Sequence, residues 1–160
     1  MMNERLRNVS WFLISLLACY LAAFVGSFFT IDAINTWYTT IQKPSFNPPN
    51  WLFGPVWTAL YTMMGICFYF INSSYHPNKK IAQILFISQL ILNALWSIIF
   101  FNLHALGLAF VEIILLWFFI LFLIVKSKPI NKWCSILLLP YLLWVTFASI
   151  LSGSIWWLNK

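Results

Sequence analysis

Five long apolar stretches restrict the fold of this chain more than any other feature of its sequence. They cover residues 11–29, 51–71, 81–101, 105–125 and 133–158. A helix that crosses a bilayer needs about 20 mostly apolar residues, and the one acid within these stretches is Glu112. Charged residues make up only 8% of the chain, which is too few to cover a soluble surface. The sequence therefore predicts an all-α integral membrane protein, a five-transmembrane-helix bundle that forms a single domain over residues 1–160.

The basic residues predict the direction of the spans. With five spans, the N-terminus and the second and fourth connections share one side of the membrane. Of the nine Lys and Arg residues, that side holds Arg5, Arg7, Lys79, Lys80, Lys126, Lys128 and Lys132. Short loops rich in Lys and Arg stay in the cytoplasm. We therefore expect a cytoplasmic N-terminus, with loop 30–50 and the C-terminus outside. The richness in Ile, Asn, Lys and Phe favours a bacterial plasma membrane, and a mitochondrial outer membrane is the alternative.

The net charge of +6 is carried by loops beside the membrane, so the expected partner is the lipid bilayer and not nucleic acid. Cys19, Cys67 and Cys134 fall in or beside apolar stretches without C-x-x-C spacing. We interpret them as small packing residues and expect no disulfide framework. His76 and His104 fall in loops on opposite sides, so no metal site is expected.

Aromatic and polar side chains recur at helical spacing in three spans, and residues three or four apart share one face of a helix. The stripes are Trp57, Tyr61, Met64 and Phe68 in the second span, Gln89, Asn93, Trp96 and Phe100 in the third, and Pro140, Trp144, Phe147 or Ala148, and Leu151 in the fifth. Ordinary helix packing explains any one stripe. Three together are typical of an apolar ligand pocket.

The depth of these residues suggests where such a pocket lies. At 1.5 Å per residue, Trp57, Asn93 and Trp96 lie within roughly 12 Å of the outer ends of their spans. This predicts a pocket in the outer half, with loop 30–50 as its lid. Glu112 lies at a similar depth and has two interpretations. It is either a protonated acid bonded between helices, for example to Asn93, or a functional residue, which means a pocket acid or a proton-coupling group.

The first span carries a different pattern. Ala18, Ala22 and Gly26 are small residues spaced four apart, a seam that lets helix backbones approach closely. Packing within the bundle explains the seam, and homodimerisation is the alternative.

Three sequence blocks are more specific than these spacing patterns. They are Trp37-Tyr38 followed by Lys43-Pro44-Ser45-Phe46-Asn47-Pro48-Pro49 and Phe53-Gly54-Pro55-Val56-Trp57-Thr58-x-Leu60-Tyr61; then Asn93-x-x-Trp96-x-x-x-Phe100-Phe101; then Pro140-Tyr141-Leu142-x-Trp144-x-x-Phe147-Ala148. Together they resemble the signature of the translocator protein family, also called TspO/MBR, tryptophan-rich sensory protein or peripheral-type benzodiazepine receptor. The resemblance covers nearly the whole chain.

The resemblance implies a five-helix bundle, often a homodimer, with a ligand cavity beneath the first outer loop. The implied ligands are protoporphyrin IX or a haem-type tetrapyrrole, and isoquinoline or benzodiazepine compounds, with no required cofactor. Carried over position by position, the pocket residues are Tyr38, Pro48, Trp57, Asn93, Trp96, Phe100, Glu112, Trp144 and Ala148. The sterol pattern needs a basic residue shortly after Tyr141. None follows until Lys160, so cholesterol binding is not expected.

Three functions are open at this point. The leading hypothesis is a membrane binding protein or sensor for tetrapyrroles. The first alternative is light- and oxygen-dependent porphyrin degradation, with Trp57 and Trp144 as photo-oxidisable residues. A conventional enzyme is not expected, because the sequence shows no Ser/His/Asp set and no paired carboxylates. The second alternative is a small porphyrin transporter that uses Glu112.

Overall fold

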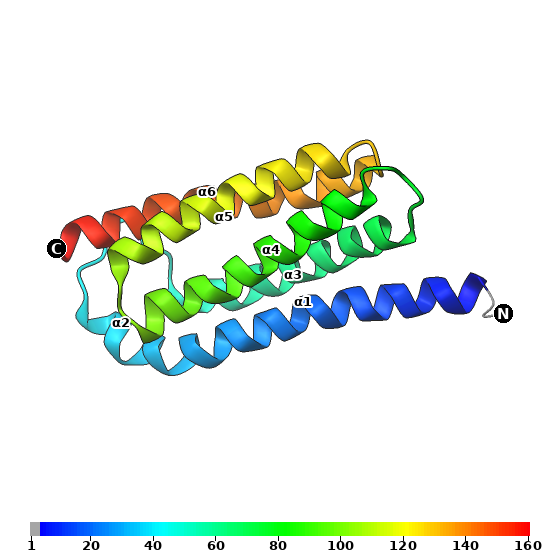
Figure 1. The fold of residues 1–160 in the computed structure, drawn as a ribbon. Helices are drawn as coiled ribbons and strands as arrows, with labels where there is room; N and C mark the ends of the chain where they lie inside the picture. The colour runs from blue at the N-terminus through cyan, green and yellow to red at the C-terminus, as the bar shows by residue number, and fades with distance from the viewer. Residues whose placement is uncertain (1–3) are drawn as a thin grey trace.

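A computed structural model describes residues 4–160 as a bundle of long helices (Figure 1). The elements are α1 (Glu4–Asn35), α2 (Trp37–Thr40), α3 (Asn50–Ser73), α4 (Lys79–Ser97), the π-helical turn η1 (Ile98–Asn102), α5 (Leu106–Ser127) and α6 (Lys132–Leu158). Five helices, with η1 continuing α4, are long and apolar enough to cross a membrane. The expected five-helix architecture is confirmed.

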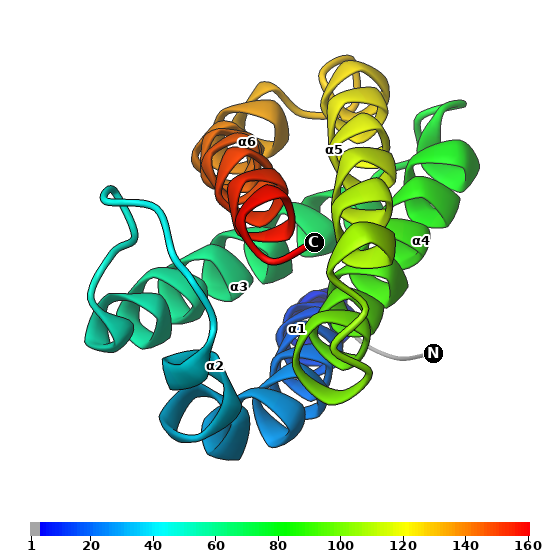
Figure 2. The ribbon, with the colours of Figure 1, turned by 90° about the vertical axis from the view of Figure 1, so that its left-hand side faces the viewer.

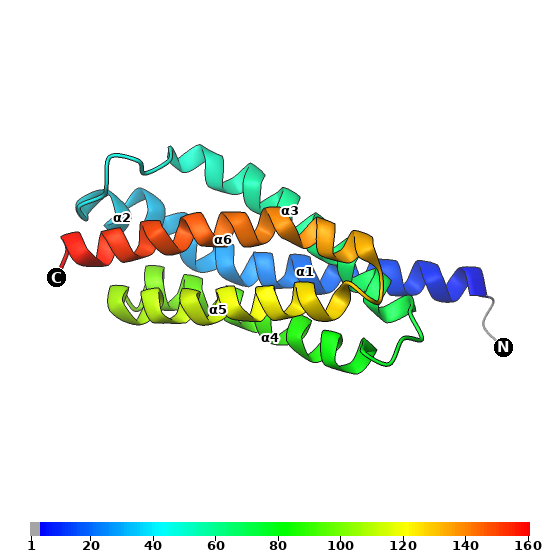
Figure 3. The ribbon, with the colours of Figure 1, turned by 90° about the horizontal axis from the view of Figure 1, so that it is seen from above.

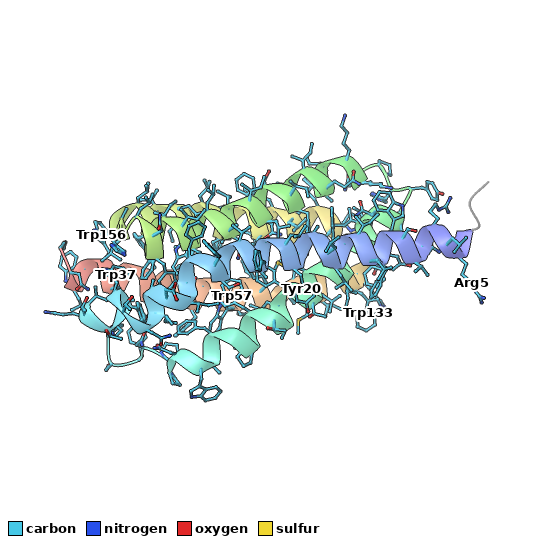
Figure 4. All side chains as sticks on the ribbon, turned by 90° about the horizontal axis from the view of Figure 1, so that it is seen from below. Arg5, Tyr20, Trp37, Trp57, Trp133 and Trp156 are labelled. Carbon is cyan, nitrogen blue, oxygen red and sulfur yellow. A yellow bond between two sulfur atoms is a disulfide. The ribbon has the colours of Figure 1, made fainter. Side chains whose placement is uncertain are left out.

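The five long helices form a ring in the order α1, α3, α6, α5 and α4. Each packs against the next, and α4 closes the ring on α1, as the end-on view in Figure 2 shows. α1 begins at one end of the bundle, and the C-terminus lies at the other (Figure 1). We call the end with α2 and the C-terminus the outer end, and the end where α1 begins the inner end. Trp37 and Trp156 lie at the outer end and Trp133 at the inner end (Figure 4), as expected for indoles at membrane interfaces.

The largest departure from the expected bounds is in α1. Its apolar run predicted residues 11–29, whereas the helix begins at Glu4 and ends at Asn35. Hydropathy marks the part of a helix that lies in apolar surroundings, and the polar turns on either side of that part are still helical. The inner end of α1 therefore projects past the other helices (Figure 3). With η1 counted as part of α4, the other four long helices begin and end within two residues of the expected bounds.

Two short elements are not visible in the sequence. One is α2, within loop 30–50. The other is η1, where the backbone N–H of Leu103 donates to the carbonyl of Ile98 at 2.9 Å. A π-helical turn is wider than an α-helical turn and changes which side chains point inward. Here the consecutive residues Phe100 and Phe101 are both buried.

The small-residue seam of α1 is used inside the bundle. Ala22 packs against the core. Gly26 is buried against α4, where a Cβ on the glycine would lie 3.2 Å from Ser97 Oγ. Packing within one chain therefore accounts for these two positions.

The interpretation of all three cysteines as packing residues is wrong for two of them. Cys67 of α3 and Cys134 of α6 form a disulfide, whereas Cys19 is a buried free thiol. Since α3 and α6 are neighbours in the ring, the two Cα atoms lie 4.5 Å apart, within the range that a disulfide can bridge. The sequence carries no signal for this pair because the order of the helices in the ring decides it.

α1 and α3 approach each other closely at Gly65. A Cβ on this glycine would lie 2.6 Å from Cδ2 and 3.2 Å from Cα of Leu16. The missing side chain lets the two backbones meet. Toward the outer end α3 turns away from α1 (Figures 2 and 4). At Gly54 no heavy atom lies within 4 Å of the Cβ position.

The two glycines provide a matched test of this crossing. Gly65→Ala and Gly54→Ala each add one methyl group to α3 and gain roughly 0.5–1 kcal/mol of helix propensity. Only Gly65→Ala forces the methyl group against Leu16, and overpacking costs about 1–3 kcal/mol. We expect thermal unfolding in detergent to show a lower midpoint for Gly65→Ala, with Gly54→Ala at or above the unsubstituted protein. Equal midpoints for the two variants would contradict the close crossing.

Candidate functional site

The bundle encloses a cavity of about 370 Å³ in its outer half. This volume is within the range of about 300–1,000 Å³ that is usual for small-molecule sites. All five long helices contribute to its wall, and Tyr38 of α2 lies at its outer end. The pocket expected beneath loop 30–50 is therefore present as a cavity.

Aromatic side chains form much of the wall. Trp96 and Phe100 stack on each other, with ring centroids 4.9 Å apart and an angle of 22° between the rings. Trp57 lies beside Tyr61, with centroids 5.6 Å apart. Trp144 contributes from α6. Flat aromatic faces on several sides of one space favour a planar apolar ligand.

A chain of hydrogen bonds closes the inner side of the cavity. Tyr61 donates to Asn93 Oδ1, Asn93 Nδ2 donates to the Tyr141 hydroxyl at 3.0 Å, and Tyr141 donates to Gln89 Oε1 at 2.9 Å. Tyr61 and Asn93 line the cavity, whereas Tyr141 and Gln89 are fully buried beside it. The chain joins α3, α4 and α6 and fixes the orientation of the Asn93 amide.

Removing one hydroxyl from this chain tests its contribution. In Tyr141→Phe, the Asn93 amide loses an acceptor and Gln89 loses a donor. A buried polar group left unsatisfied costs about 1–3 kcal/mol, so we expect a lower midpoint of thermal unfolding in detergent. The control is Tyr69→Phe, because the Tyr69 ring of α3 contacts Phe12 of α1 and the neighbouring Phe70 and makes no hydrogen bond in the described part of the chain. A Tyr141→Phe midpoint as high as that of the control would contradict the role of the chain.

Loop 30–50 is organised around Tyr38. This residue is 3% exposed, and its hydroxyl donates to Asn47 Oδ1 at 2.6 Å. Lys43 donates to the Tyr38 carbonyl and lies 4.7 Å from the centroid of its ring, a cation–π distance. Burial raises the pKa of Tyr38 to about 12, so the hydroxyl remains a donor at neutral pH.

Two contacts tie this loop to the rest of the bundle. The backbone of Gln42 exchanges hydrogen bonds of 2.9 and 2.8 Å with the side chain of Asn159, at the end of α6. Trp37 stacks on His104, with centroids 4.1 Å apart and rings inclined by 16°. His104 connects η1 to α5 and has a positive φ of 53°, which histidine adopts more readily than most residues. The loop is thus clamped over the outer end of the cavity.

The structure brings together most of the residues that the family resemblance selected. Seven of the nine line the cavity, and they are Tyr38, Trp57, Asn93, Trp96, Phe100, Trp144 and Ala148. Pro48 and Glu112 are not among the lining residues. Sequence reasoning missed the contribution of α1, which includes Tyr20, Ser27 and Thr30. Their spacing of seven and three residues places the three hydroxyls on one face of the helix, and this pattern is the signal that could have found it.

Glu112 lies on α5 and is 8% exposed. Within the described residues, neither of its carboxyl oxygens has a hydrogen-bond partner. The bond to Asn93 considered from the sequence is not formed. Tyr61 and Tyr141 bond to both ends of the Asn93 amide instead.

Comparison with known proteins places this fold and cavity in a family. The model of the TspO/MBR family matches residues 15–158. The chain belongs to the TspO/MBR family. It is 43% identical to the tryptophan-rich protein TspO of Archaeoglobus fulgidus over 152 residues, which cover 95% of this chain and 99% of the relative. The tryptophan-rich protein TspO of Chlorobaculum tepidum is 42% identical over 143 residues, 88% of this chain and 90% of the relative. The human translocator protein is 35% identical over 143 residues, 88% of this chain and 85% of the relative.

Membership of the TspO/MBR family, together with the five apolar helices, makes this a multi-pass membrane protein. The three sequence blocks that carry the resemblance meet in space. The first lies in loop 30–50 and the outer half of α3, the second at the end of α4 and in η1, and the third in the middle of α6. All three contribute to the cavity, so the TspO/MBR signature coincides with its wall.

Proposed function

We propose that this TspO/MBR protein is a membrane binding protein or sensor that holds a tetrapyrrole such as protoporphyrin IX in the cavity. The observation that carries the proposal is the arrangement of Trp57, Trp96 and Trp144 around one apolar space in the outer half of the bundle. Each aromatic contact with a flat macrocycle contributes about 0.5–1.5 kcal/mol beyond the burial of area. A tetrapyrrole presents two large π faces, so it benefits from several such contacts at once.

The charges around the cavity favour one orientation of this ligand. Propionate groups need a cation or water, and Lys43 is held against Tyr38 at the outer end. The inner side is closed by the buried hydrogen bonds of Asn93 and Tyr141. We therefore place the propionates toward loop 30–50 and the macrocycle among the tryptophans. Isoquinoline-type ligands would use the same aromatic walls.

The distribution of charge supports the membrane orientation. The α3–α4 and α5–α6 connections lie at the inner end, where Lys79 and Lys80 begin α4, Lys126 is in the last turn of α5 and Lys128 follows it. Short basic loops favour the cytoplasmic side. In a bacterial plasma membrane, loop 30–50 would then face outward and the ligand would lie in the outer leaflet.

A second candidate function is light- and oxygen-dependent degradation of the bound porphyrin. Trp57 and Trp144 both line the cavity, where they would contact the macrocycle. Indoles in this position are oxidisable, which favours this candidate over one that needs a conventional catalytic set.

Titration in the dark tests the binding proposal. Protoporphyrin IX added to the detergent-purified protein should quench tryptophan fluorescence to saturation. In Trp144→Phe, loss of the larger indole contact should weaken affinity by roughly two- to tenfold. The matched control is Trp117→Phe, because Trp117 donates to Thr146 at 2.8 Å and does not line the cavity. Quenching that stays linear would show partition into the micelle. Equal weakening by both variants would also contradict binding in this cavity.

Illumination separates the two candidate functions. If the protein degrades porphyrin, light and oxygen should give a new absorbing product with the unsubstituted protein and much less with Trp57→Phe or Trp144→Phe. The same bleaching with all three proteins would show that the cavity only hosts the porphyrin.

A further inference from the structure

The wall of the cavity is not equally closed on all sides. Every lining residue contributed by α4, η1, α5 and α6 is buried or half-buried. The exposed lining residues all belong to two neighbouring helices. They are Tyr20, Ser27 and Ile31 on α1, and Asn50, Gly54 and Thr58 on α3. The cavity therefore opens between α1 and α3. Figure 4 shows Tyr20 and Trp57 along this line.

The gap has a definite inner end. The Tyr20 hydroxyl and Thr62 Oγ1 are hydrogen-bonded at 2.8 Å, and one turn further inward Gly65 meets Leu16. From there the helices diverge, and the space beside Gly54 is empty to at least 4 Å. Twelve residues of α3 separate Asn50 from Thr62, which corresponds to roughly 18 Å of helix. This is about half of a bilayer with its interfaces, so the gap faces the lipid of one leaflet.

The rim of the gap suits contact with lipid. Ser27, Thr30 and Thr58 each donate their hydroxyl to a carbonyl one turn earlier in their own helix, at 2.6, 2.8 and 2.9 Å. Their hydrogen-bonding needs are therefore met without water. The residues that line the cavity on this side include Gly54, which has no side chain, and none of them is charged. A molecule dissolved in the bilayer can pass the rim without stripping water from an ion.

The outer end of the cavity is different. Loop 30–50 covers it, with Gln42 bonded to Asn159 and Trp37 stacked on His104. Entry from the aqueous side would require these contacts to break together. Entry from the bilayer breaks none of these loop contacts. It requires at most a small separation of α1 and α3 at the Tyr20–Thr62 hydrogen bond.

We propose that the ligand enters and leaves the cavity sideways, from the outer leaflet, through the gap between α1 and α3. The ligand class that fits this route is a membrane-dissolved amphiphile with a flat apolar body and a polar end that stays near the interface. The identity of the ligand rests on the function proposed above, whereas the route rests on the gap itself.

A bulky side chain in the gap tests the route. Gly54→Phe adds a ring where the native structure has empty space, and Ala59→Phe adds the same ring to an exposed position of α3 that does not line the cavity. With protoporphyrin IX in nanodiscs, stopped-flow quenching should show association slowed on the order of tenfold in Gly54→Phe. Dissociation into protein-free vesicles should slow as well, because a blocked route hinders both directions. A lost binding contact would instead speed dissociation. Ala59→Phe should match the unsubstituted protein.

A second variant weakens the attachment of loop 30–50 and leaves the gap between α1 and α3 unchanged. Asn159→Ala removes both side-chain bonds to Gln42, and lateral entry predicts unchanged association. Faster association in Asn159→Ala, with no effect of Gly54→Phe, would overturn the proposal and assign entry to loop 30–50. A change of oligomeric state in Gly54→Phe, measured by light scattering, would also overturn it, because a second copy would then cover the gap.

One readout needs no porphyrin and keeps the route separate from the proposed function. Ala148→Cys places a thiol on the cavity wall, while the native cysteines are buried or paired. In proteoliposomes this thiol should react with a membrane-dissolved pyrene maleimide and resist a charged, water-soluble thiosulfonate. Adding Gly54→Phe should slow the maleimide reaction. Preferential reaction with the water-soluble reagent would overturn lateral entry even if the protein binds porphyrin. If the labelling is as expected but the porphyrin titration fails, the proposed ligand is wrong and the proposed route stands.

Discussion

Three helices of this protein are joined by a single chain of hydrogen bonds, from Tyr61 through Asn93 and Tyr141 to Gln89. Inside a bilayer, apolar side chains meet lipid as readily as they meet each other, so buried polar contacts and close packing have to fix the helices. This chain fixes α3, α4 and α6 at one depth. The cavity lies directly beside these hydrogen bonds, because Tyr61 and Asn93 take part in them and also line the cavity wall.

Small residues determine how closely the helices around the site approach one another. Gly65 lets α3 approach α1 at the inner side, and Gly26 lets α1 approach α4. With these points held together, α3 diverges from α1 toward the outer end (Figure 2). The result is a space that is lined by aromatic rings, covered on the aqueous side by the clamped loop, and open toward lipid. The proposed binding site for a flat molecule and the proposed passage to the membrane thus follow from the same helix positions.

Much of this architecture could be predicted from the sequence, for physical reasons. The length of apolar runs fixes the number of spans because a bilayer has a fixed thickness. The stripes that contain Trp57, Asn93 and Trp144 identify inward faces because aromatic and amide side chains gather where helices enclose a site. Depth along each span then gives the outer half as the position of the cavity.

Other features could not be predicted, because they depend on how the helices are arranged around the ring. The Cys67–Cys134 disulfide requires that α3 and α6 be neighbours, which no span pattern reveals. The contribution of α1 depends on the direction in which Tyr20 and Ser27 point. The π-helical turn that buries both Phe100 and Phe101 has no local signal in the sequence. Glu112, selected by the resemblance, lies outside the cavity wall because only the packed structure decides which face of α5 meets it.

The most direct test of the account is a structure of the protein crystallised in lipid with zinc-substituted protoporphyrin, in which anomalous scattering locates the metal. We expect the zinc peak in the outer half of the bundle between Trp57 and Trp144, with density for one macrocycle edge in the gap between α1 and α3. A peak in the lipid outside the helices, or in the surface groove of α5 and α6 beside Phe110 and Gly153, would contradict the account.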